Sequence, residues 1–367
     1  MRKIMLVFGT RPEAIKMCPL VKELEARPKE FETIVCVTGQ HREMLEQVLM
    51  AFEVKPNYNL QIMVPGQTLT DVTRNVLEGL GPVLDSEKPD AVLVHGDTTT
   101  SFAAALACFY RHIPVGHVEA GLRTRNLESP WPEEFNRQAV DVISNWFFAP
   151  TETSRDNLLA ENKEASRIFV TGNTGIDALR TTVKKNYSHP MLDWVGRDKL
   201  ILITAHRREN LGEPMHRMFR AIRHVIESHQ DIKAIYPIHM NPQVRIAAHE
   251  ELDGFDRLRI IEPLDVLDFH NIMARSYMIL TDSGGIQEEA PALGKPVLVM
   301  RDTTERPEGV TAGTLRLVGT NESDIEGAFC ELLENKDSYA RMSHASNPYG
   351  DGYASERIAN ILAMSIA

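Results

Sequence analysis

Three carboxylates in the first half of the chain are candidates for proton-transfer chemistry. Asp97 and Glu119 follow successive apolar runs, and Glu133 lies in the segment PWPEEFNR. Positioned carboxylates can donate or accept protons during a reaction, and clustering raises the pKa of one of them so that it holds a proton near neutral pH. Each also has a structural alternative, either an ion-pair partner or, for Asp97 ahead of Thr98, a helix N-cap.

Two further segments could bind a phosphate. Arg11 and Lys16 lie in GTRPEAIK, directly after the first apolar run, where Pro12 suits the first turn of a helix. Helix N-termini favour anions, and the glycines of the segment TDSGG let backbone N–H groups approach a ligand. The alternatives are solvated surface cations for the first segment and a plain turn for the second.

Two more polar residues follow apolar runs in the second half of the chain. Glu289 lies one turn into the helix expected after TDSGG, where a carboxylate can accept hydrogen bonds from ribose hydroxyls. His206 precedes two arginines in the loop TAHRREN, which suits an anionic ligand. A lone histidine, however, is more often structural.

The sequence excludes several other kinds of site. It contains no GxGxxG, no GxxxxGK[ST], no HExxH and no Cys/His set with zinc spacing, so we expect neither a nicotinamide cofactor nor a metal. A net charge of −11 opposes binding to nucleic acid and to anionic membranes. No apolar stretch approaches the roughly 18 residues of a membrane span. The four cysteines are widely spaced in apolar segments, which indicates reduced thiols and a cytoplasmic protein.

Short apolar runs must position these residues. The runs are rich in Val, Ile and Leu and alternate with helical segments, the pattern of parallel sheets covered on both faces. They span residues 4–8, 33–37, 91–94, 146–149, 168–170, 200–203, 234–236, 278–280 and 296–300. We therefore predict a doubly wound α/β protein in which the polar clusters meet at the carboxyl ends of the strands.

The length of 367 residues predicts two domains, because it exceeds what one hydrophobic core usually organises. A weakly patterned stretch, residues 184–199, marks the edge of the connection between them. The tail has helical spacing of Ile358, Ile361 and Leu362, and we expect it to return to the first domain. The predicted domains are residues 1–170 with 353–367, and residues 171–352.

Nine segments, in order along the chain, give a more specific identification. They are GTRPEAIK, GQHREML, VHGDTTT, GHVEAGLRT, PWPEEFNR, TGNTGIDAL, TAHRREN, TDSGGIQEEAPALGKPVLVMRDTTERPEG and NPYGDG. Together they resemble the non-hydrolysing UDP-N-acetylglucosamine 2-epimerases over nearly the whole chain, and TAHRRENLGEP and IEPLDVLDFHN resemble their Gram-positive branch. The resemblance implies two Rossmann-like domains facing a cleft, similar to the B-type glycosyltransferase fold, with the nucleotide in the cleft.

The resemblance also implies roles for individual residues. The implied catalytic residues are Asp97, Glu119, Glu133 and His206. Those implied to bind the UDP-sugar are Arg11, Lys16, Phe269, Ser283, Gly284, Gly285, Glu289 and Arg306. A second, activating substrate molecule is implied beside Gln40, His41, Gln67, Arg207 and His239. Because Gly66 stands where the Gram-positive enzymes carry an arginine, we expect activation to be weak or absent.

The implied reaction is reversible epimerisation at carbon 2 between UDP-N-acetylglucosamine and UDP-N-acetylmannosamine, without a cofactor. The proton on carbon 2 is not next to a carbonyl, so it becomes labile only as UDP leaves carbon 1 to give 2-acetamidoglucal. Cations must stabilise the leaving diphosphate, and carboxylates must remove and return the proton. The resemblance further implies a homodimer and a product used in bacterial cell-surface polysaccharide.

Three other functions are compatible with parts of this pattern. A hydrolysing epimerase releases free UDP and N-acetylmannosamine from the same fold. A B-type glycosyltransferase shares the fold but does not require three carboxylates. A non-catalytic sugar-nucleotide sensor leaves the three carboxylates near an anionic ligand, where they weaken binding.

Overall fold

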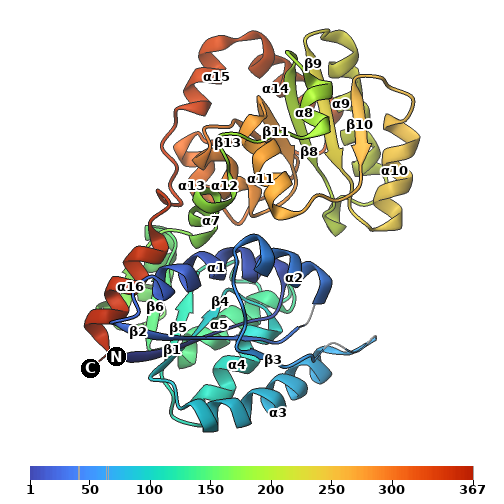
Figure 1. Ribbon diagram of the computed structural model, residues 1–367. Coiled ribbons are helices and arrows are strands. Elements are labelled where there is room, and N and C mark those ends of the chain that lie inside the picture. The colour runs from blue at the N-terminus through green and yellow to red at the C-terminus, as the bar shows by residue number, and fades with distance from the viewer. Residues whose placement is uncertain (40–41, 63, 65, 367) are drawn as a thin grey trace. The chain divides into compact units, whose positions relative to one another are not determined.

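The strands form two parallel sheets, one in each of two units. The computed structural model describes residues 1–39, 42–62, 64 and 66–366. Unit 1 comprises Met1–Thr181 and Tyr349–Ala367, and unit 2 comprises Thr182–Pro348. Each sheet has helices on both faces (Figure 1), which confirms the predicted α/β class.

The sheet of unit 1 has the strand order β3-β2-β1-β4-β5-β6-β7, with every described pair parallel. The strands are β1 (Arg2–Phe8), β2 (Phe31–Val37), β3 (Tyr58–Asn59), β4 (Ala91–His95), β5 (Val115–Val118), β6 (Trp146–Ala149) and β7 (Ile168–Val170). The order reverses between β1 and β4, which is where ligands bind in open α/β sheets. Candidate residues follow both of these strands.

Helices cover the two faces of this sheet. They are α1 (Arg11–Glu25), α2 (Arg42–Ala51), α3 (Leu69–Glu87), α4 (Thr99–Phe109), α5 (Glu133–Ile143), α6 (Glu152–Ala160), η1 (Ala165–Arg167), α7 (Thr174–Thr182) and α16 (Ala354–Ser365). On one face, α3 and α4 bury apolar residues such as Val76 and Ala104 against the strands. On the other, α1 contacts α2 and α16. The two chain ends lie side by side (Figure 1), joined by a hydrogen bond from Arg2 Nε to the Ile366 carbonyl oxygen.

The sheet of unit 2 has the order β10-β9-β8-β11-β12-β13 and is also parallel. Its strands are β8 (Lys199–Thr204), β9 (Ile232–Pro237), β10 (Leu258–Ile261), β11 (Met278–Thr281), β12 (Val297–Val299) and β13 (Leu315–Leu317). Its helices are α8 (Pro190–Val195), η2 (Arg208–Asn210), α9 (Glu213–Ser228), α10 (Pro242–Leu252), α11 (Val266–Arg275), α12 (Ile286–Ala292), α13 (Pro307–Ala312), α14 (Glu322–Glu334) and α15 (Lys336–Ser343). The core lies between these strands and α9, α10 and α14.

The unit boundaries differ from those expected from the sequence because α7 is tied to α16. The Asp177 carboxylate of α7 accepts hydrogen bonds from the backbone N–H groups of Ala354, at 3.1 Å, and Ser355, at 2.6 Å. These bonds connect α7 to the start of α16, and both lie in unit 1. No helix among the described residues is long and apolar enough to cross a membrane.

Candidate active site

The start of α1 is fixed by a buried carboxylate. Glu13 accepts hydrogen bonds from the backbone N–H groups of Gly9, at 3.0 Å, and Thr10, at 2.7 Å. Its other oxygen accepts from the hydroxyls of Thr98, at 2.7 Å, and Ser101, at 3.0 Å. Glu13 therefore joins the loop before α1 to the first turn of α4 and places Arg11 beside the loop that carries Asp97.

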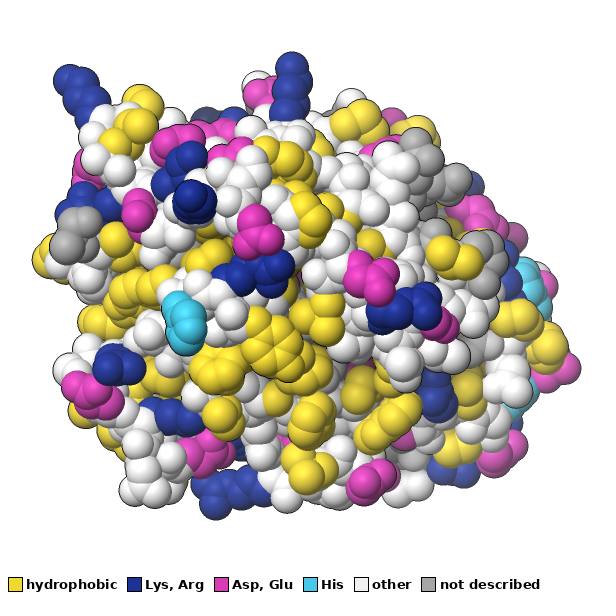
Figure 2. All heavy atoms as spheres, turned by 90° about the horizontal axis from the view of Figure 1, so that it is seen from below, with side chains coloured by type: hydrophobic (Ala, Val, Ile, Leu, Met, Phe, Trp, Pro, Cys, Tyr) yellow, Lys and Arg dark blue, Asp and Glu magenta, His cyan; other side chains and the backbone are white. Residues whose placement is uncertain are grey.

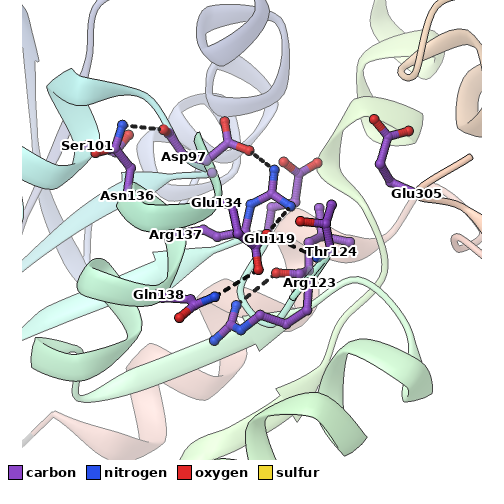
Figure 3. Close-up of polar contacts among 12 residues, drawn as sticks. Asp97, Ser101, Glu119, Arg123, Thr124, Glu134, Asn136, Arg137, Gln138 and Glu305 are labelled. Carbon is purple, nitrogen blue, oxygen red and sulfur yellow. Dashed lines mark hydrogen bonds and ion pairs between the residues drawn. The ribbon is translucent and has the colours of Figure 1, made fainter. Parts of the chain in front are cut away.

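Asp97 lies between β4 and α4 and is held by two neighbouring residues of α5. Arg137 forms an ion pair with the Asp97 carboxylate, and Asn136 Nδ2 donates to the Asp97 carbonyl oxygen at 2.9 Å. Figure 3 shows both residues reaching Asp97 from the same helix. The N-cap of α4 is Thr98, whose hydroxyl accepts from the Ser101 N–H at 3.0 Å. The N-cap interpretation of Asp97 is therefore wrong, which leaves its carboxylate for the ion pair.

Glu134, which the sequence analysis did not single out, connects this helix to the loop after β5. Its buried carboxylate accepts from the backbone N–H groups of Thr124 and Arg125, both at 3.0 Å. It also pairs with Arg137 at 3.1 Å (Figure 3). Arg137 thus bridges Asp97 and Glu134, so one guanidinium aligns two loops of the candidate site.

Glu119 follows β5 and is held by one residue of α1 and one residue of the loop before α7. Its Oε1 pairs with Lys16 Nζ of α1 and accepts from Asn173 Nδ2, before α7, at 3.0 Å. The Glu119 side chain is only 9% exposed. Its φ angle is +69°, an uncommon value for a residue with a side chain. Lys16, assigned to the diphosphate from the resemblance, therefore contacts a carboxylate.

Glu133 differs from the other two carboxylates because it has no counter-charge. It is the first residue of α5 and is partly exposed. Within the described part of the chain it makes no hydrogen bond or ion pair. The structure thus gives two of the three predicted acids a basic partner and leaves the third available at a helix N-terminus.

A buried histidine supports the backbone next to Asp97. The ring nitrogens of His117 face two acceptors, the Asp141 carboxylate at 2.6 Å and the Gly96 carbonyl oxygen at 2.8 Å. Asp141 also pairs with Arg123 at 2.7 Å. Burial raises the pKa of Asp141, but His117 and Arg123 outweigh burial and lower it. This network fixes the carbonyl of the loop that carries Asp97.

In unit 2 a buried aspartate orders the loop after β8. The Asp282 carboxylate accepts from the backbone N–H groups of His206 and Arg207, each at 2.9 Å, and from Asn210 Nδ2 at 3.1 Å. The His206 ring stacks on His239 at a centroid distance of 5.2 Å. Burial lowers the pKa of His206, and the charges of His239 and Arg207 lower it further. The Asp282 carboxylate opposes this shift without cancelling it. His206 is therefore neutral at pH 7.

The glycine turn after β11 is the position in unit 2 where two guanidinium groups approach the backbone. A Cβ atom on Gly284 would lie 2.8 Å from Arg306 Nη1 and 3.1 Å from Arg207 Nη2, so both guanidinium groups lie against the backbone of this glycine. Arg306 pairs with Glu288 at 2.6 Å and Arg207 Nε donates to the Asp282 carbonyl oxygen at 3.2 Å. Two cations beside open backbone can receive an anion.

The remaining predicted ligands of unit 2 lie on α11 and α12. Glu289 of α12 faces His270 Nε2 at 3.6 Å, and the other nitrogen of His270 contacts the Thr182 hydroxyl at 2.7 Å. Phe269 precedes His270 on α11 and is partly exposed. The structure thus brings Glu289 close to α11, where Phe269 was expected to pack beside a base.

The residues expected at a second-substrate site are described only in part. Gln40 and His41 lie outside the described residues. Gln67 Oε1 accepts from the Val64 N–H at 3.2 Å, in unit 1. In unit 2, Arg207 lies beside Gly284, and His239 is exposed beneath His206.

Possible metal ligands also come together in unit 2, which sequence spacing did not indicate. Among the described residues, ligand atoms of His229, Cys330 and Glu334 lie within 4.8 Å of one another. His229 Nε2 is 3.2 Å from Glu334 Oε1, and its Nδ1 contacts the Val225 carbonyl oxygen at 3.0 Å. An ordinary ion pair accounts for this geometry.

The supporting residues that sequence reasoning missed lie inside the quoted segments. Arg137 ends PWPEEFNR, Asn173 lies in TGNTGIDAL, and Asp282 begins DSGG. The signal was their presence in these segments, but only the fold shows which loop each one contacts.

Comparison with known proteins identifies the family. The family model described as UDP-N-acetylglucosamine 2-epimerase matches residues 22–363. The UDP-N-acetylglucosamine 2-epimerase of Bacillus subtilis (strain 168) is 62% identical over 356 residues, which cover 97% of this chain and 93% of the relative. That of Escherichia coli (strain K12) is 54% identical over 373 residues and covers 98% of each chain.

Solved structures agree with the fold. The UDP-GlcNAc 2-epimerase from Neisseria meningitidis, bound to UDP-GlcNAc, has a TM-score of 0.91 at 49% identity over 98% of this chain and 99% of its own. The glycosyltransferase of kitacinnamycin has a TM-score of 0.67 at 11% identity, over 100% and 99% of the two chains, a likeness of fold alone. The fold, with one Rossmann-like sheet in each unit, is thus similar to the B-type glycosyltransferase fold. The chain belongs to the UDP-N-acetylglucosamine 2-epimerase family, a family of isomerases, as the sequence motifs predicted.

Proposed function

We propose that this chain interconverts UDP-N-acetylglucosamine and UDP-N-acetylmannosamine without hydrolysis, by eliminating UDP to 2-acetamidoglucal and adding it back. The observation that carries the proposal is the pair of carboxylates after β4 and β5, each next to its own cation. A basic partner holds a carboxylate in a fixed orientation, which suits it to transfer a proton. Two such groups suit a reaction that removes a proton from one face of a sugar and returns it to the other.

Unit 1 supplies the acid/base groups in this proposal. Asp97, Glu119 and Glu133 exchange the proton on carbon 2, and Arg137 and Lys16 position the first two. As UDP departs with the electron pair of its bond to carbon 1, the covalent bond between carbon 2 and its hydrogen breaks. Its electron pair forms the double bond to carbon 1, and the proton moves to a carboxylate. Readdition of a proton from the other face and return of UDP to carbon 1 complete the inversion.

Unit 2 supplies the groups for the nucleotide. Arg207 and Arg306 beside Gly284 are placed to stabilise a departing diphosphate, with Ser283, Gly285 and His206 nearby. Glu289 and Phe269 hold the ribose and the uracil. The Neisseria relative bound to UDP-GlcNAc supports this ligand.

Incubation with UDP-N-acetylglucosamine in D2O, followed by NMR, tests the function. Both epimers should form without added nicotinamide cofactor or metal, each with deuterium at carbon 2, while the UDP remains bound to the sugar. Release of free UDP and N-acetylmannosamine would instead identify a hydrolysing epimerase. Epimerisation that keeps the original hydrogen would refute elimination.

We further propose that the enzyme is cytoplasmic, acts as a homodimer and provides N-acetylmannosamine units for cell-surface polysaccharide. The four cysteines are all free thiols, which suits a reducing compartment. Exposed apolar side chains on neighbouring helices α4 and α5 support self-association. Figure 2 shows hydrophobic side chains gathered on the lower side of the molecule, where α3 and α4 lie in Figure 1.

A further inference from the structure

Glu134 of α5 is a buried carboxylate that the proposed reaction does not use. Its side chain has no exposed surface. Oε2 accepts from the Thr124 N–H at 3.0 Å and from Arg137 Nη1 at 3.1 Å (Figure 3). Oε1 accepts from the Arg125 N–H at 3.0 Å and from Gln138 Nε2 at 2.8 Å. An ionised carboxylate has about four acceptor sites, so these donors occupy all of them and suit Glu134 to hold other groups in place rather than to transfer a proton.

One of the four donors belongs to a guanidinium group that also holds Asp97. Arg137 Nη1 contacts Glu134 and Nη2 contacts Asp97 Oδ2, and the Arg137 side chain is only 8% exposed. Its Nε is buried and has no hydrogen-bond partner in the described part of the chain. The orientation of the guanidinium therefore depends on its two terminal nitrogens, each of which has its own carboxylate.

The division of Arg137 between two carboxylates leaves one oxygen of Asp97 open. An arginine beside a single carboxylate frequently contacts both of its oxygens with two nitrogens. Here Glu134 holds one of those nitrogens, so Asp97 is contacted through Oδ2 alone. Asp97 Oδ1 makes no hydrogen bond or ion pair with any residue that the structure describes, and the Asp97 side chain is 27% exposed. A carboxylate with one oxygen fixed and the other open is suited to take a proton from a bound sugar.

We propose that Glu134 is a positioning residue that holds one nitrogen of Arg137 away from Asp97 and thereby keeps Asp97 Oδ1 open for the proton on carbon 2. The inference rests on the proposed epimerisation and assigns the reacting oxygen within it. The covalent bond between carbon 2 and its hydrogen breaks, and its electron pair forms the carbon 1–carbon 2 double bond. UDP leaves with the electron pair of its bond to carbon 1, and the proton binds Oδ1. Without the charge of Glu134, Arg137 turns both terminal nitrogens to Asp97 and covers this oxygen.

Glu134→Gln tests this role because it keeps the shape of the side chain and removes its charge. The neutral amide competes poorly for the guanidinium, so Arg137 pairs with the remaining carboxylate, Asp97. We expect kcat to fall about 100-fold, the scale of a misplaced catalytic group, while the dissociation constant for UDP stays within about twofold. Gln138→Ala is the matched control, because it removes a donor from the other oxygen of Glu134 and leaves the contact with Arg137. Its kcat should stay within about twofold of the wild type.

Two double variants show which catalytic carboxylate Glu134 serves. In an Asp97→Asn background, Glu134→Gln should cause less than about a twofold further loss of kcat, because the two residues act through one oxygen. In a Glu133→Gln background the full loss should persist, although Glu133 is the neighbouring residue in the sequence. An undiminished loss in the Asp97→Asn background, or a loss that disappears in the Glu133→Gln background, overturns the proposal.

Arg137→Lys keeps the proposal testable if circular dichroism shows that Glu134→Gln does not fold. Lysine has one nitrogen in place of the guanidinium fork, so it cannot hold Glu134 and Asp97 by separate nitrogens. We expect kcat to fall at least about tenfold, while UDP affinity is unchanged. A wild-type kcat in Arg137→Lys contradicts the role given to the divided guanidinium and overturns the proposal.

A crystal structure of the Glu134→Gln variant tests the inference independently of turnover. Both terminal nitrogens of Arg137 should lie within hydrogen-bonding distance of Asp97, one on each carboxylate oxygen. A variant in which Arg137 keeps a single contact with Asp97 and leaves Oδ1 open overturns the role of Glu134. A wild-type protein that fails to epimerise instead overturns the proposed function.

Discussion

At the scale of single residues, the proposed acid/base carboxylates lie in unit 1, whereas two of the proposed phosphate ligands, Arg207 and Arg306, lie in unit 2. Asp97 and Glu119 are paired with cations that belong to unit 1, whereas Arg207 and Arg306 lie beside the glycine turn of unit 2. Because the carboxylates already have partners, removing their charge changes proton transfer more than it changes anion binding. The two groups should therefore give different phenotypes when substituted.

The first prediction concerns the three acids. Asp97→Asn, Glu119→Gln and Glu133→Gln should each slow epimerisation at least about 100-fold, the usual effect of losing a general acid or base. The substitutions keep side-chain shape and remove a negative charge, so UDP affinity should be unchanged or higher. A rate assay beside calorimetric titration with UDP measures both quantities.

Substitutions of the predicted phosphate ligands are the matched comparison. Arg11→Ala should cost about 1.5–3 kcal/mol of UDP binding, since a charge-assisted contact is lost. His206→Ala should cost only about 0.5–1.5 kcal/mol, because a lowered pKa leaves this ring neutral. If the carboxylate variants lose UDP as severely as Arg11→Ala, the division into acid/base and phosphate groups is wrong.

The second prediction concerns regulation at Gly66. Glycine has no side chain to offer a second substrate molecule, and among the described residues beyond its chain neighbours no atom lies within 4 Å of a Cβ placed at this position. Initial rates should therefore rise hyperbolically with UDP-N-acetylmannosamine. A sigmoidal curve, or an inert substrate that becomes active after a trace of the other epimer, would contradict this.

Which candidate residues lie after strands could be read from the sequence, but their partners could not. Lys16 of α1 and Asn173, before α7, lie far from Glu119 along the chain, and the Arg137 contact with Asp97 requires the packing of α5 beside α4. Such contacts depend on the order of strands in the sheet. Spacing along the chain carries no information on that order, so these residues were missed as supports of the site.

At the scale of elements, the continuous apolar runs predicted strands well and the short ones poorly. All nine predicted runs overlap strands, from β1 to β12. The list lacked β3, β5, β10 and β13, which have two to four residues each. Arg259 and Arg316 interrupt β10 and β13, and as edge strands these need not be apolar on both faces. Short length explains the omissions, together with edge position for β3, β10 and β13 and the interruption of the central strand β5 by Gly116 and His117.

The third prediction concerns the junction of α1 and α4. Glu13→Ala leaves two backbone N–H groups and two hydroxyls without their shared acceptor, so unfolding free energy should fall by about 3 kcal/mol. Activity should fall too, since the loops of Arg11 and Asp97 lose their connection. Urea unfolding measures the stability. Glu30→Ala, at an exposed site of unit 1, should change it by less than about 0.5 kcal/mol.

The fourth prediction concerns the loop after β12. Burial alone raises the pKa of Glu305, but Arg301, at 2.8 Å, and Arg306 outweigh it and lower the pKa to about 2. A depressed pKa contributes stability that is fully present above the unfolded value of 4.5 and is lost as pH falls toward 2. The contribution is at most about 3 kcal/mol.

Glu305→Gln should therefore lower the free energy of unfolding at pH 7. It should also reduce the decrease in that free energy between pH 5 and pH 2. Urea unfolding at a series of pH values measures both effects. Asp302→Asn, at an exposed position of the same loop, should retain the wild-type pH profile. A Glu305→Gln protein with that same profile would show that the two arginines do not stabilise the ionised carboxylate.

At the scale of the whole molecule, one surface of unit 1 is too apolar for a helix face exposed to water. Phe102 and Phe109 lie seven residues apart on α4, and Phe135 and Val142 lie seven apart on α5. The centroids of the Phe102 and Phe135 rings are 5.7 Å apart, so the apolar side chains of α4 and those of α5 lie next to each other. Phe109 is 54% exposed and Val142 is 71% exposed. Contiguous apolar surface of this kind marks an interaction site, in contrast to single exposed residues.

The last prediction is that a second copy of the chain covers this α4–α5 surface. Val142→Glu places a charge in the middle of an apolar contact, where burial without a partner is costly, so the variant should sediment as a monomer while the wild type sediments as a dimer. Met364→Glu, at an isolated methionine of α16 that is 80% exposed, changes charge equally and should stay dimeric. Because Val142 is exposed in the single chain, the Val142→Glu protomer should fold normally. Circular dichroism and UDP titration check this. If Val142→Glu remains a dimer, the subunits meet elsewhere, and if the wild type is a monomer at micromolar concentration, this surface does not serve self-association.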